Sequence, residues 1–219
     1  YMIFLLKVLI ELVISYKQSK FEFLTFNKRN MYVESPKPRM TALNFFLYQL
    51  LDTKGPNQSK HETKRREVIG RLACDVIIGF TSSVQHKCTQ KQDPKLADPD
   101  MTFIRKFTIE CLTKALKDTT SSHKSLQMFV GKLYGWFDLT SSLLLTERSY
   151  LHAILDTDTA HPDKYQICKL MLEMNVPSII ADCVASLDLN YPFSKKLFNC
   201  SIEPLNAINK IRNEFSELF

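Results

Sequence analysis

The chain has 219 residues, of which 45% are hydrophobic and 24% charged, values typical of a folded globular protein and not of a disordered one. Only 5 residues are glycine, which argues against a turn-rich β architecture. The net charge of +6 is spread along the chain and does not form the concentrated basic face that is typical of nucleic-acid binding.

The N-terminal stretch is strongly apolar. Tyr1 to about Ser19 is predicted to form the first helix, and Phe21 to Phe26 continues it or forms a short second one. No basic leader precedes the run and no small-residue cleavage site follows it, and it is shorter than the ~20 residues that span a bilayer. We therefore expect a helix that is buried on most sides. Because the chain starts at Tyr1, we interpret it as a piece of a longer protein.

The rest of the chain alternates between helical patterns and polar connections. Thr41 is placed to cap the next helix, and Asn27 to Met40 before it is polar, with extended backbone expected before Pro36 and Pro38. Gly131 and Gly135 allow a neighbouring helix to approach closely, or bend their own helix. The predicted helices after the first are 41–51, 62–80, 100–117, 123–146, 163–174, 175–188, 192–200 and 205–219. The helix over 123–146 is expected to be the longest. Pro204 is expected to break or kink the chain between the last two helices.

The stretch from Asn175 to Pro192 shows the helical pattern most clearly. Asn175 can cap the helix start, and Pro177 is tolerated in the first turn. The apolar residues are spaced by 3, 1, 3, 1 and 3 positions, which draws a single stripe along a helix: Val176, Ile179, Ile180, Cys183, Val184 and Leu187. A helix with such a stripe must pack on the helices before and after it.

These patterns predict an all-α fold of about eight to ten helices with no sheet. Consecutive antiparallel helices of roughly 12 to 24 residues suit an armadillo- or HEAT-like α-solenoid, in which each unit stacks on its neighbours. Residues 1–219 are interpreted as a single armadillo-like helical segment, a fragment of a much larger protein.

The cysteines do not indicate catalysis. The six cysteines are Cys74, Cys88, Cys111, Cys168, Cys183 and Cys200. None forms a Cys-x-x-Cys pair, and five of the six lie in helical patterns. Buried thiols in a reducing compartment are the expected state, so we expect the protein in the cytoplasm, the nucleus or both. Cys183 lies on an apolar stripe, where burial raises a thiol's pKa.

No other motif predicts a catalytic, cofactor or metal site. His86 and Cys88 have no second ligand pair at zinc-finger spacing, and no phosphate-binding glycine loop is present. The charged run from Lys60 to Arg66 could meet an acidic partner or phosphates, but a solvated, frayed helix start is the preferred interpretation. Basic residues at a helix N-terminus oppose the helix dipole, so we expect poor order there.

Four blocks of sequence together resemble one family. They are Leu12 with Ser15-Tyr16-Lys17 and Lys20-Phe21-Glu22-Phe23, Lys37-Pro38-Arg39 with Leu43-Asn44-Phe45, Phe103-Ile104-Arg105-Lys106-Phe107 with Ala115-Leu116-Lys117-Asp118, and Leu187-Asp188-Leu189-Asn190-Tyr191-Pro192 with Pro204-Leu205. In this order they are similar to the N-terminal armadillo-like region of the giant HECT-type E3 ubiquitin ligases of the yeast Tom and animal Huwe type. Glu203 departs from the arginine that the family favours before Pro204, and Ser82 to Pro99 has no counterpart in the pattern.

The resemblance implies a non-catalytic scaffold that presents protein substrates for ubiquitination. The catalytic cysteine of such ligases belongs to a C-terminal HECT domain, so no catalytic residue is carried over to this chain. The expected partners are flanking helical repeats of the same chain and the protein substrates of the ligase, with no membrane. A free-standing HEAT- or armadillo-type interaction adaptor is the alternative.

Overall fold

The computed structural model describes residues 1–29, 41–51, 60–83, 98–121, 130–145, 160–188, 190 and 194–218. Within these ranges the chain forms nine α-helices and one π-helical turn, with no strand, so the predicted all-α class is confirmed. The elements are α1 (Met2–Ser15), α2 (Lys17–Arg29), α3 (Ala42–Phe45), η1 (Phe46–Leu50), α4 (Lys60–Thr81), α5 (Pro99–Ser121), α6 (Val130–Leu144), α7 (Ala160–Glu173), α8 (Val176–Ala185) and α9 (Ser194–Glu214).

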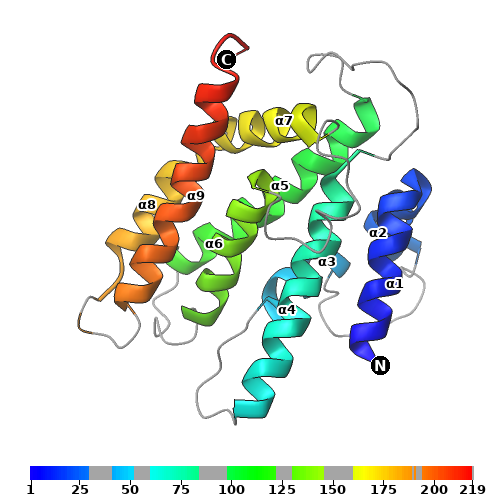
Figure 1. The fold of residues 1–219 in the computed structure, drawn as a ribbon, viewed down its shortest axis with the longest axis horizontal. Coiled ribbons are helices and arrows are strands. Elements are labelled where there is room, and N and C mark those ends of the chain that lie inside the picture. The colour runs from blue at the N-terminus through cyan, green and yellow to red at the C-terminus, as the bar shows by residue number, and fades with distance from the viewer. Residues whose placement is uncertain are drawn as a thin grey trace.

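The long helices α4, α5 and α6 run through the middle of the molecule (Figure 1). On one edge α1 packs along α4, and on the opposite edge α9 packs along α6. The helices α7 and α8 both pack on α5. Several extensive pairings therefore join helices that are not consecutive in the chain, such as α1 with α4, α5 with α8 and α6 with α9.

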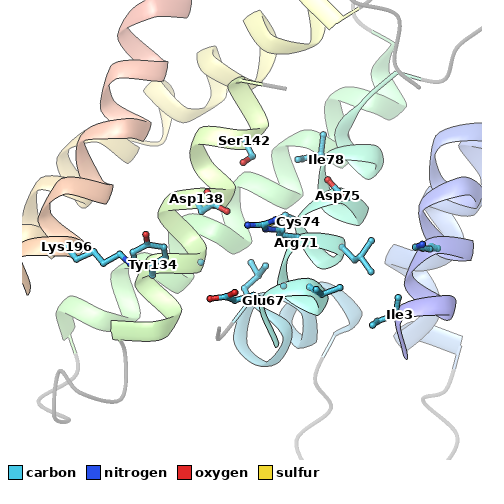
Figure 2. Close-up of a pocket in the computed structure, with 16 residues that line it drawn as sticks. Ile3, Glu67, Arg71, Cys74, Asp75, Ile78, Tyr134, Asp138, Ser142 and Lys196 are labelled. Carbon is cyan, nitrogen blue, oxygen red and sulfur yellow. The ribbon is translucent and has the colours of Figure 1, made fainter. Parts of the chain in front are cut away.

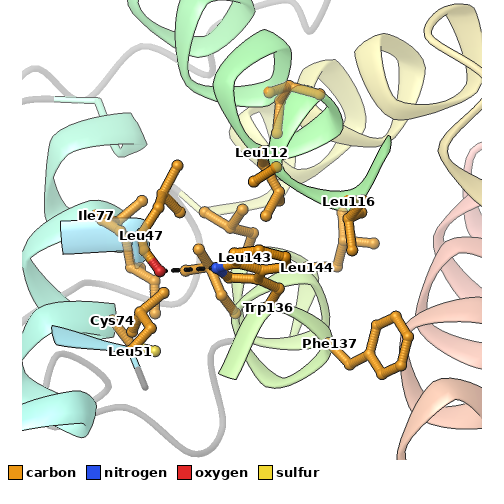
Figure 3. Packing of buried hydrophobic residues seen from close by; sticks show 14 of the residues in the cluster. Leu47, Leu51, Cys74, Ile77, Leu112, Leu116, Trp136, Phe137, Leu143 and Leu144 are labelled. Carbon is orange, nitrogen blue, oxygen red and sulfur yellow. Dashed lines mark hydrogen bonds between the residues drawn. The ribbon is translucent and has the colours of Figure 1, made fainter. Parts of the chain in front are cut away.

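One large apolar cluster joins the helices, with Phe23 of α2 packed at its margin and Trp136 of α6 near its centre (Figure 3). The indole of Trp136 is fully buried, and its Nε1 donates a hydrogen bond of 2.8 Å to the carbonyl of Leu47 in η1. Its ring also meets Tyr48 edge to face, with 5.4 Å between ring centroids. A buried indole N–H needs such a partner, so the bond fixes how α6 docks on the π-turn.

Gly135 permits the close contact between α6 and the end of η1. A Cβ atom at this position would lie 2.3 Å from the backbone oxygen of Leu51, which is closer than any side chain tolerates. The close approach predicted for this glycine is therefore confirmed, and any larger residue would push the two segments apart.

Three predicted features at helix ends are confirmed or corrected by the structure. The hydroxyl of Thr41 accepts a hydrogen bond from the backbone N–H of Asn44 at 3.1 Å, so the cap is confirmed. Asn175 occupies the N-cap position in the left-handed conformation, with a φ of 57°. The predicted side-chain cap is therefore wrong: the Asn175 side chain makes no hydrogen bond to the backbone of the helix and instead accepts one of 2.8 Å from the hydroxyl of Ser178. The N-terminal helix ends at Ser15, because Tyr16 has extended backbone with φ −129° and ψ 117°.

The course of two other helices also differs from the prediction. Pro204 does not end its helix, since α9 continues from Ser194 to Glu214. Buried residues on both sides of Pro204 hold the helix against its neighbours, which offsets the lost backbone bond. The basic stretch that begins at Lys60 is helical and exposed rather than frayed. The predicted helix from His123 is described only from Val130, and residues 123–129 lie outside the described part.

Candidate functional site

The described thiols are packed into the helical interior and are all free. Cys74, Cys168 and Cys183 are buried, while Cys111 and Cys200 are half-buried. The thiol of Cys168 donates to the carbonyl of Ile208 at 3.6 Å, and that of Cys183 to the carbonyl of Leu116 at 3.5 Å. These contacts are typical of structural cysteines.

Burial also makes these thiols poor nucleophiles. It raises the pKa of Cys111 and Cys168 to about 11, and it raises the pKa of Cys183 against the opposing effect of a hydrogen bond from Thr119. The pKa of Cys74 is raised well above its ordinary value by burial first and then by the carboxylates of Asp138 and Asp75. A reactive thiol needs a lowered pKa, so these four have the opposite chemistry.

Among the residues that the structure describes, no three His, Cys, Asp or Glu side chains gather closely enough to hold a metal ion. No helix in the described ranges is both long and apolar enough to cross a membrane. His86 and Cys88 lie outside the described residues.

The most elaborate polar cluster lies where α4 ends, and we name it the polar junction: Lys20, Thr81, Ser83, Arg105, Asp163 and Gln166. Arg105 of α5 is 1% exposed and donates from Nε to the carbonyl of Thr81 at 2.8 Å. Its other nitrogens donate to Ser83 Oγ at 2.9 Å, to Asp163 Oδ1 at 2.5 Å and to Gln166. Asp163 in turn accepts bonds from the backbone N–H and the hydroxyl of Ser83 at 2.6 and 2.7 Å.

Lys20 of α2 completes the polar junction. Its side chain is fully buried, and Nζ donates to the carbonyl of Gly79 at 2.8 Å and to the carbonyl of Ser82. The pKa of Lys20 is lowered to about 7, mainly by burial; the charge of Asp163 opposes this shift, and the charge of Arg105 adds to it. An uncharged amine has two N–H donors, which match the two carbonyls that it meets.

The polar junction fastens four helices to one another. Lys20 of α2 and Arg105 of α5 donate to carbonyls at the end of α4, where a helix presents unsatisfied acceptors. Asp163 of α7 accepts from Arg105 and from Ser83, just after α4. Both basic side chains are inaccessible to a substrate. In the described residues every buried side-chain nitrogen and oxygen has a hydrogen-bond partner. The cluster is therefore structural.

Sequence reasoning did not single out these two buried cations, although one signal was available. Arg105 lies between Met101 and Ile109 at intervals of four residues, on the buried side of α5. A basic residue on an apolar stripe indicates a buried partner, which here is Asp163. For Lys20 no comparable pattern exists, because its acceptors are backbone carbonyls from a distant part of the chain.

Most of the exposed large apolar side chains in the described part of the chain lie along the outer face of α1. Leu6, Ile10, Val13 and Ile14 face inward, where α4 approaches closely at Gly79. The opposite side is open to solvent, with exposed fractions of 94% for Tyr1, 65% for Phe4, 42% for Leu5, 41% for Val8, 41% for Leu12 and 61% for Tyr16. A stripe of this kind is typical of an interface.

A groove runs along α4 between α1 and α6, with a volume of about 850 Å3 (Figure 2). Residues of α4 form its floor, and Tyr134, Asp138 and Ser142 of α6 form one wall. Ile3 and Lys7 of α1 form the other wall, and Lys196 of α9 closes one end with its ammonium 5.6 Å from the centre of the Tyr134 ring. The groove and the outer face of α1 are the surfaces available for binding.

Comparison with known proteins decides the family. Over all 219 residues the chain is 62% identical to a probable E3 ubiquitin-protein ligase TOM1 from Eremothecium gossypii. The chain is homologous to a segment of the TOM1 ligases. The E3 ubiquitin-protein ligase TOM1 of Saccharomyces cerevisiae is 56% identical over 220 aligned positions, and a TOM1-like ligase of Neurospora crassa is 25% identical over 230. The resemblance to the Tom-type ligases is thus confirmed along the whole chain.

The chain aligns with only a small part of each of these relatives. It spans about 7% of the length of the two TOM1 proteins. No protein-family profile matches the chain, and no solved structure matches it. The TOM1 relationship therefore rests on sequence identity with whole ligases, and the role of this segment within such a ligase has to be argued from its own surfaces.

Proposed function

We propose that this chain is a non-catalytic, armadillo-like scaffold segment of a giant HECT-type E3 ubiquitin ligase, and that it helps to present protein substrates for ubiquitination. The observation that carries the proposal is the identity of 62% over the full chain with a TOM1 ligase. The raised pKa values of Cys74, Cys111, Cys168 and Cys183 support a role without catalysis, because ubiquitin transfer by a HECT enzyme needs a reactive thiolate.

The helix packing supports an armadillo-like arrangement. The pairs α1 with α4, α5 with α8 and α6 with α9 each lie three helices apart. Armadillo repeats of three helices stack with this interval. On this proposal the segment continues a longer stack, and flanking helical repeats of the same polypeptide are its main partners.

The outer face of α1 is where we expect a flanking repeat to pack. At ~25 cal/mol per Å2, burying a few hundred Å2 of this stripe stabilises the assembly by several kcal/mol, comparable to the whole stability of a domain. Free thiols at five described positions suit a reducing compartment, so we propose the cytoplasm, the nucleus or both as its location.

The function is tested by deleting this segment from the full-length ligase. We expect the deletion variant to form a ubiquitin thioester at the parent rate but to modify far fewer proteins in cells, measured by proteomics of ubiquitin remnants on lysine. Loss of the thioester would show that the segment acts in catalysis, and an unchanged set of modified proteins would refute substrate presentation.

The packing of α1 is tested by placing photoreactive benzoylphenylalanine at Phe4 of the full-length ligase. We expect irradiation to join Phe4 to another part of the same polypeptide, as mapped by mass spectrometry. The same amino acid at Asn213, which is exposed on α9, is the control for random labelling. Cross-links from Phe4 only to other proteins would contradict an intramolecular partner.

A further inference from the structure

The groove along α4 has the size of a binding site. Its volume of about 850 Å3 falls within the roughly 300–1,000 Å3 of ordinary ligand sites and accommodates a few residues of peptide. The residues of α4 that line it lie on one face of the helix, with Glu67 and Arg71 exposed at the rim and Cys74, Asp75 and Ile78 buried on the floor. The rigid helix presents these side chains to one open channel (Figure 2).

The rim of the groove is basic. Three exposed cations line it from three different helices, namely Lys7 of α1, Arg71 of α4 and Lys196 of α9. Glu67 is the exposed acid that lines it. Within the described part of the chain, neither Lys7 nor Arg71 forms an ion pair. An occupant at the rim therefore meets more positive than negative charge.

Two of the three carboxylates that line the groove lie deeper than its cations. Asp75 is 6% exposed and Asp138 is half-buried, and both already make other interactions. Both lie close enough to the buried thiol of Cys74 to raise its pKa. Acidic groups on an occupant would be repelled from this floor and held at the rim.

The groove also offers apolar contacts. Ile3 of α1 and Val68 of α4 line it, and Val68 is 40% exposed. We propose that this groove binds a short acidic, amphipathic polypeptide segment, with its carboxylates at the rim beside Lys7, Arg71 and Lys196 and its apolar side chains against Ile3 and Val68. The proposal goes beyond the scaffold role, because it assigns a surface and a class of partner and does not require ubiquitin transfer.

The probe for this proposal is a fluorescein-labelled peptide of ten residues in which Glu and Leu alternate. Its binding to the full-length protein is measured by fluorescence anisotropy. The test variant carries Lys7→Glu and Arg71→Glu, and the control variant carries Lys169→Glu and Lys210→Glu, two exposed lysines outside the groove. Both variants change the net charge equally, so they separate the groove from general attraction.

We expect the test variant to bind the probe at least about tenfold more weakly, with the control variant within about twofold of the parent. The affinity of the parent should fall as salt is added. A photoreactive version of the probe should cross-link to the segment from Glu67 to Ile78 or to the facing residues of α6.

Four results would overturn the proposal. The first is no binding of the probe to the parent up to about 1 mM. The second is an equal loss in the test and control variants, which would reduce the effect to net charge. The third is equal binding of a peptide in which Lys replaces Glu. The fourth is tighter binding of single-stranded oligothymidine than of the peptide, together with loss of oligothymidine binding in the test variant. That result would make the groove a nucleic-acid site.

Discussion

The polar junction and the outer face of α1 are opposite in character. In the polar junction the charged groups of Lys20, Arg105 and Asp163 are largely or wholly removed from water, and each has partners. On the outer face of α1, large apolar side chains remain in contact with water, with Phe4 65% and Leu12 41% exposed. The polar junction buries ionisable side chains, which are usually exposed, and the outer face of α1 exposes apolar side chains, which are usually buried.

The difference separates what holds this segment together from what is available to join it to something else. The buried charges are specific to the packing of α2, α4, α5 and α7, and every buried polar side-chain atom in the described residues is satisfied. The exposed stripe on α1 contributes nothing to that packing. Substitutions in the polar junction should therefore change the stability of the segment, whereas substitutions on the stripe should change only its association.

Arg105→Met should have the largest effect, lowering the free energy of unfolding of the 219-residue chain by about 3–5 kcal/mol. Removal of one partner leaves Asp163 as a nearly buried, uncompensated charge and leaves the carbonyl of Thr81 without its donor. Urea denaturation followed by circular dichroism measures the loss. Arg71→Met, at an exposed position, is the matched control, and a loss below about 1 kcal/mol at Arg105 would show that the cluster stabilises little.

Lys20→Met should remove a pH dependence. In the unfolded chain Lys20 keeps its proton to about pH 10.5, but in the folded chain the pKa of Lys20 is about 7. Between pH 7 and pH 8.5 the unfolded chain therefore binds more protons, so the stability of the parent should rise by about 2 kcal/mol relative to the variant. Urea denaturation of both proteins at the two pH values measures this difference.

The comparison stops at pH 8.5 because at higher pH the thiols of Cys111 and Cys168 lose their protons more readily in the unfolded chain than in the folded one. Their deprotonation lowers the stability of the folded chain as pH rises, which opposes the effect of Lys20. If the free energy of unfolding changed equally in the parent and the Lys20→Met variant between the two pH values, Lys20 would stay protonated in the folded chain. Its buried charge would then be balanced by Asp163.

Lys17→Ala should cost at most about 1 kcal/mol, although Lys17 makes two ion pairs of 2.6 Å, with Asp98 and Asp100. All three side chains are more than one third exposed, so water screens the attraction. Comparison of thermal midpoints at low salt and at about 1 M salt should show the parent approaching the variant. A cost as large as that of Arg105→Met would break the contrast between buried and exposed charges.

Substitution of Phe4 and Leu12 by serine should leave the stability of the chain within about 0.5 kcal/mol of the parent. We expect the parent chain to self-associate through the stripe and the double variant to be monomeric, as measured by sedimentation velocity. Ile10→Ala, on the inner face of the same helix, is the contrasting control and should cost about 2–4 kcal/mol. A monomeric parent would show that the stripe does not drive association in the isolated chain.

The sequence predicted the elements whose partners are set by their own periodicity. The stripe of α8 is an example, because Val176, Ile179, Ile180 and Cys183 are all buried as their spacing indicated. Features that depend on distant segments were harder to predict. Pro204 was expected to interrupt a helix that tertiary packing preserves, and Lys20 gave no signal because its acceptors are the carbonyls of Gly79 and Ser82. The groove also combines four separate helices, so no single stretch indicated it.

The bond between Trp136 and Leu47 also has a consequence for synthesis on the ribosome. The two residues are 89 positions apart in the sequence. At roughly 5–20 residues per second, the π-turn leaves the ribosome several seconds before the helix that covers it has been made. During that interval Leu47 and Leu51 lack the helix that buries them, so the nascent chain is a candidate for chaperone binding until Gly135 and Trp136 arrive.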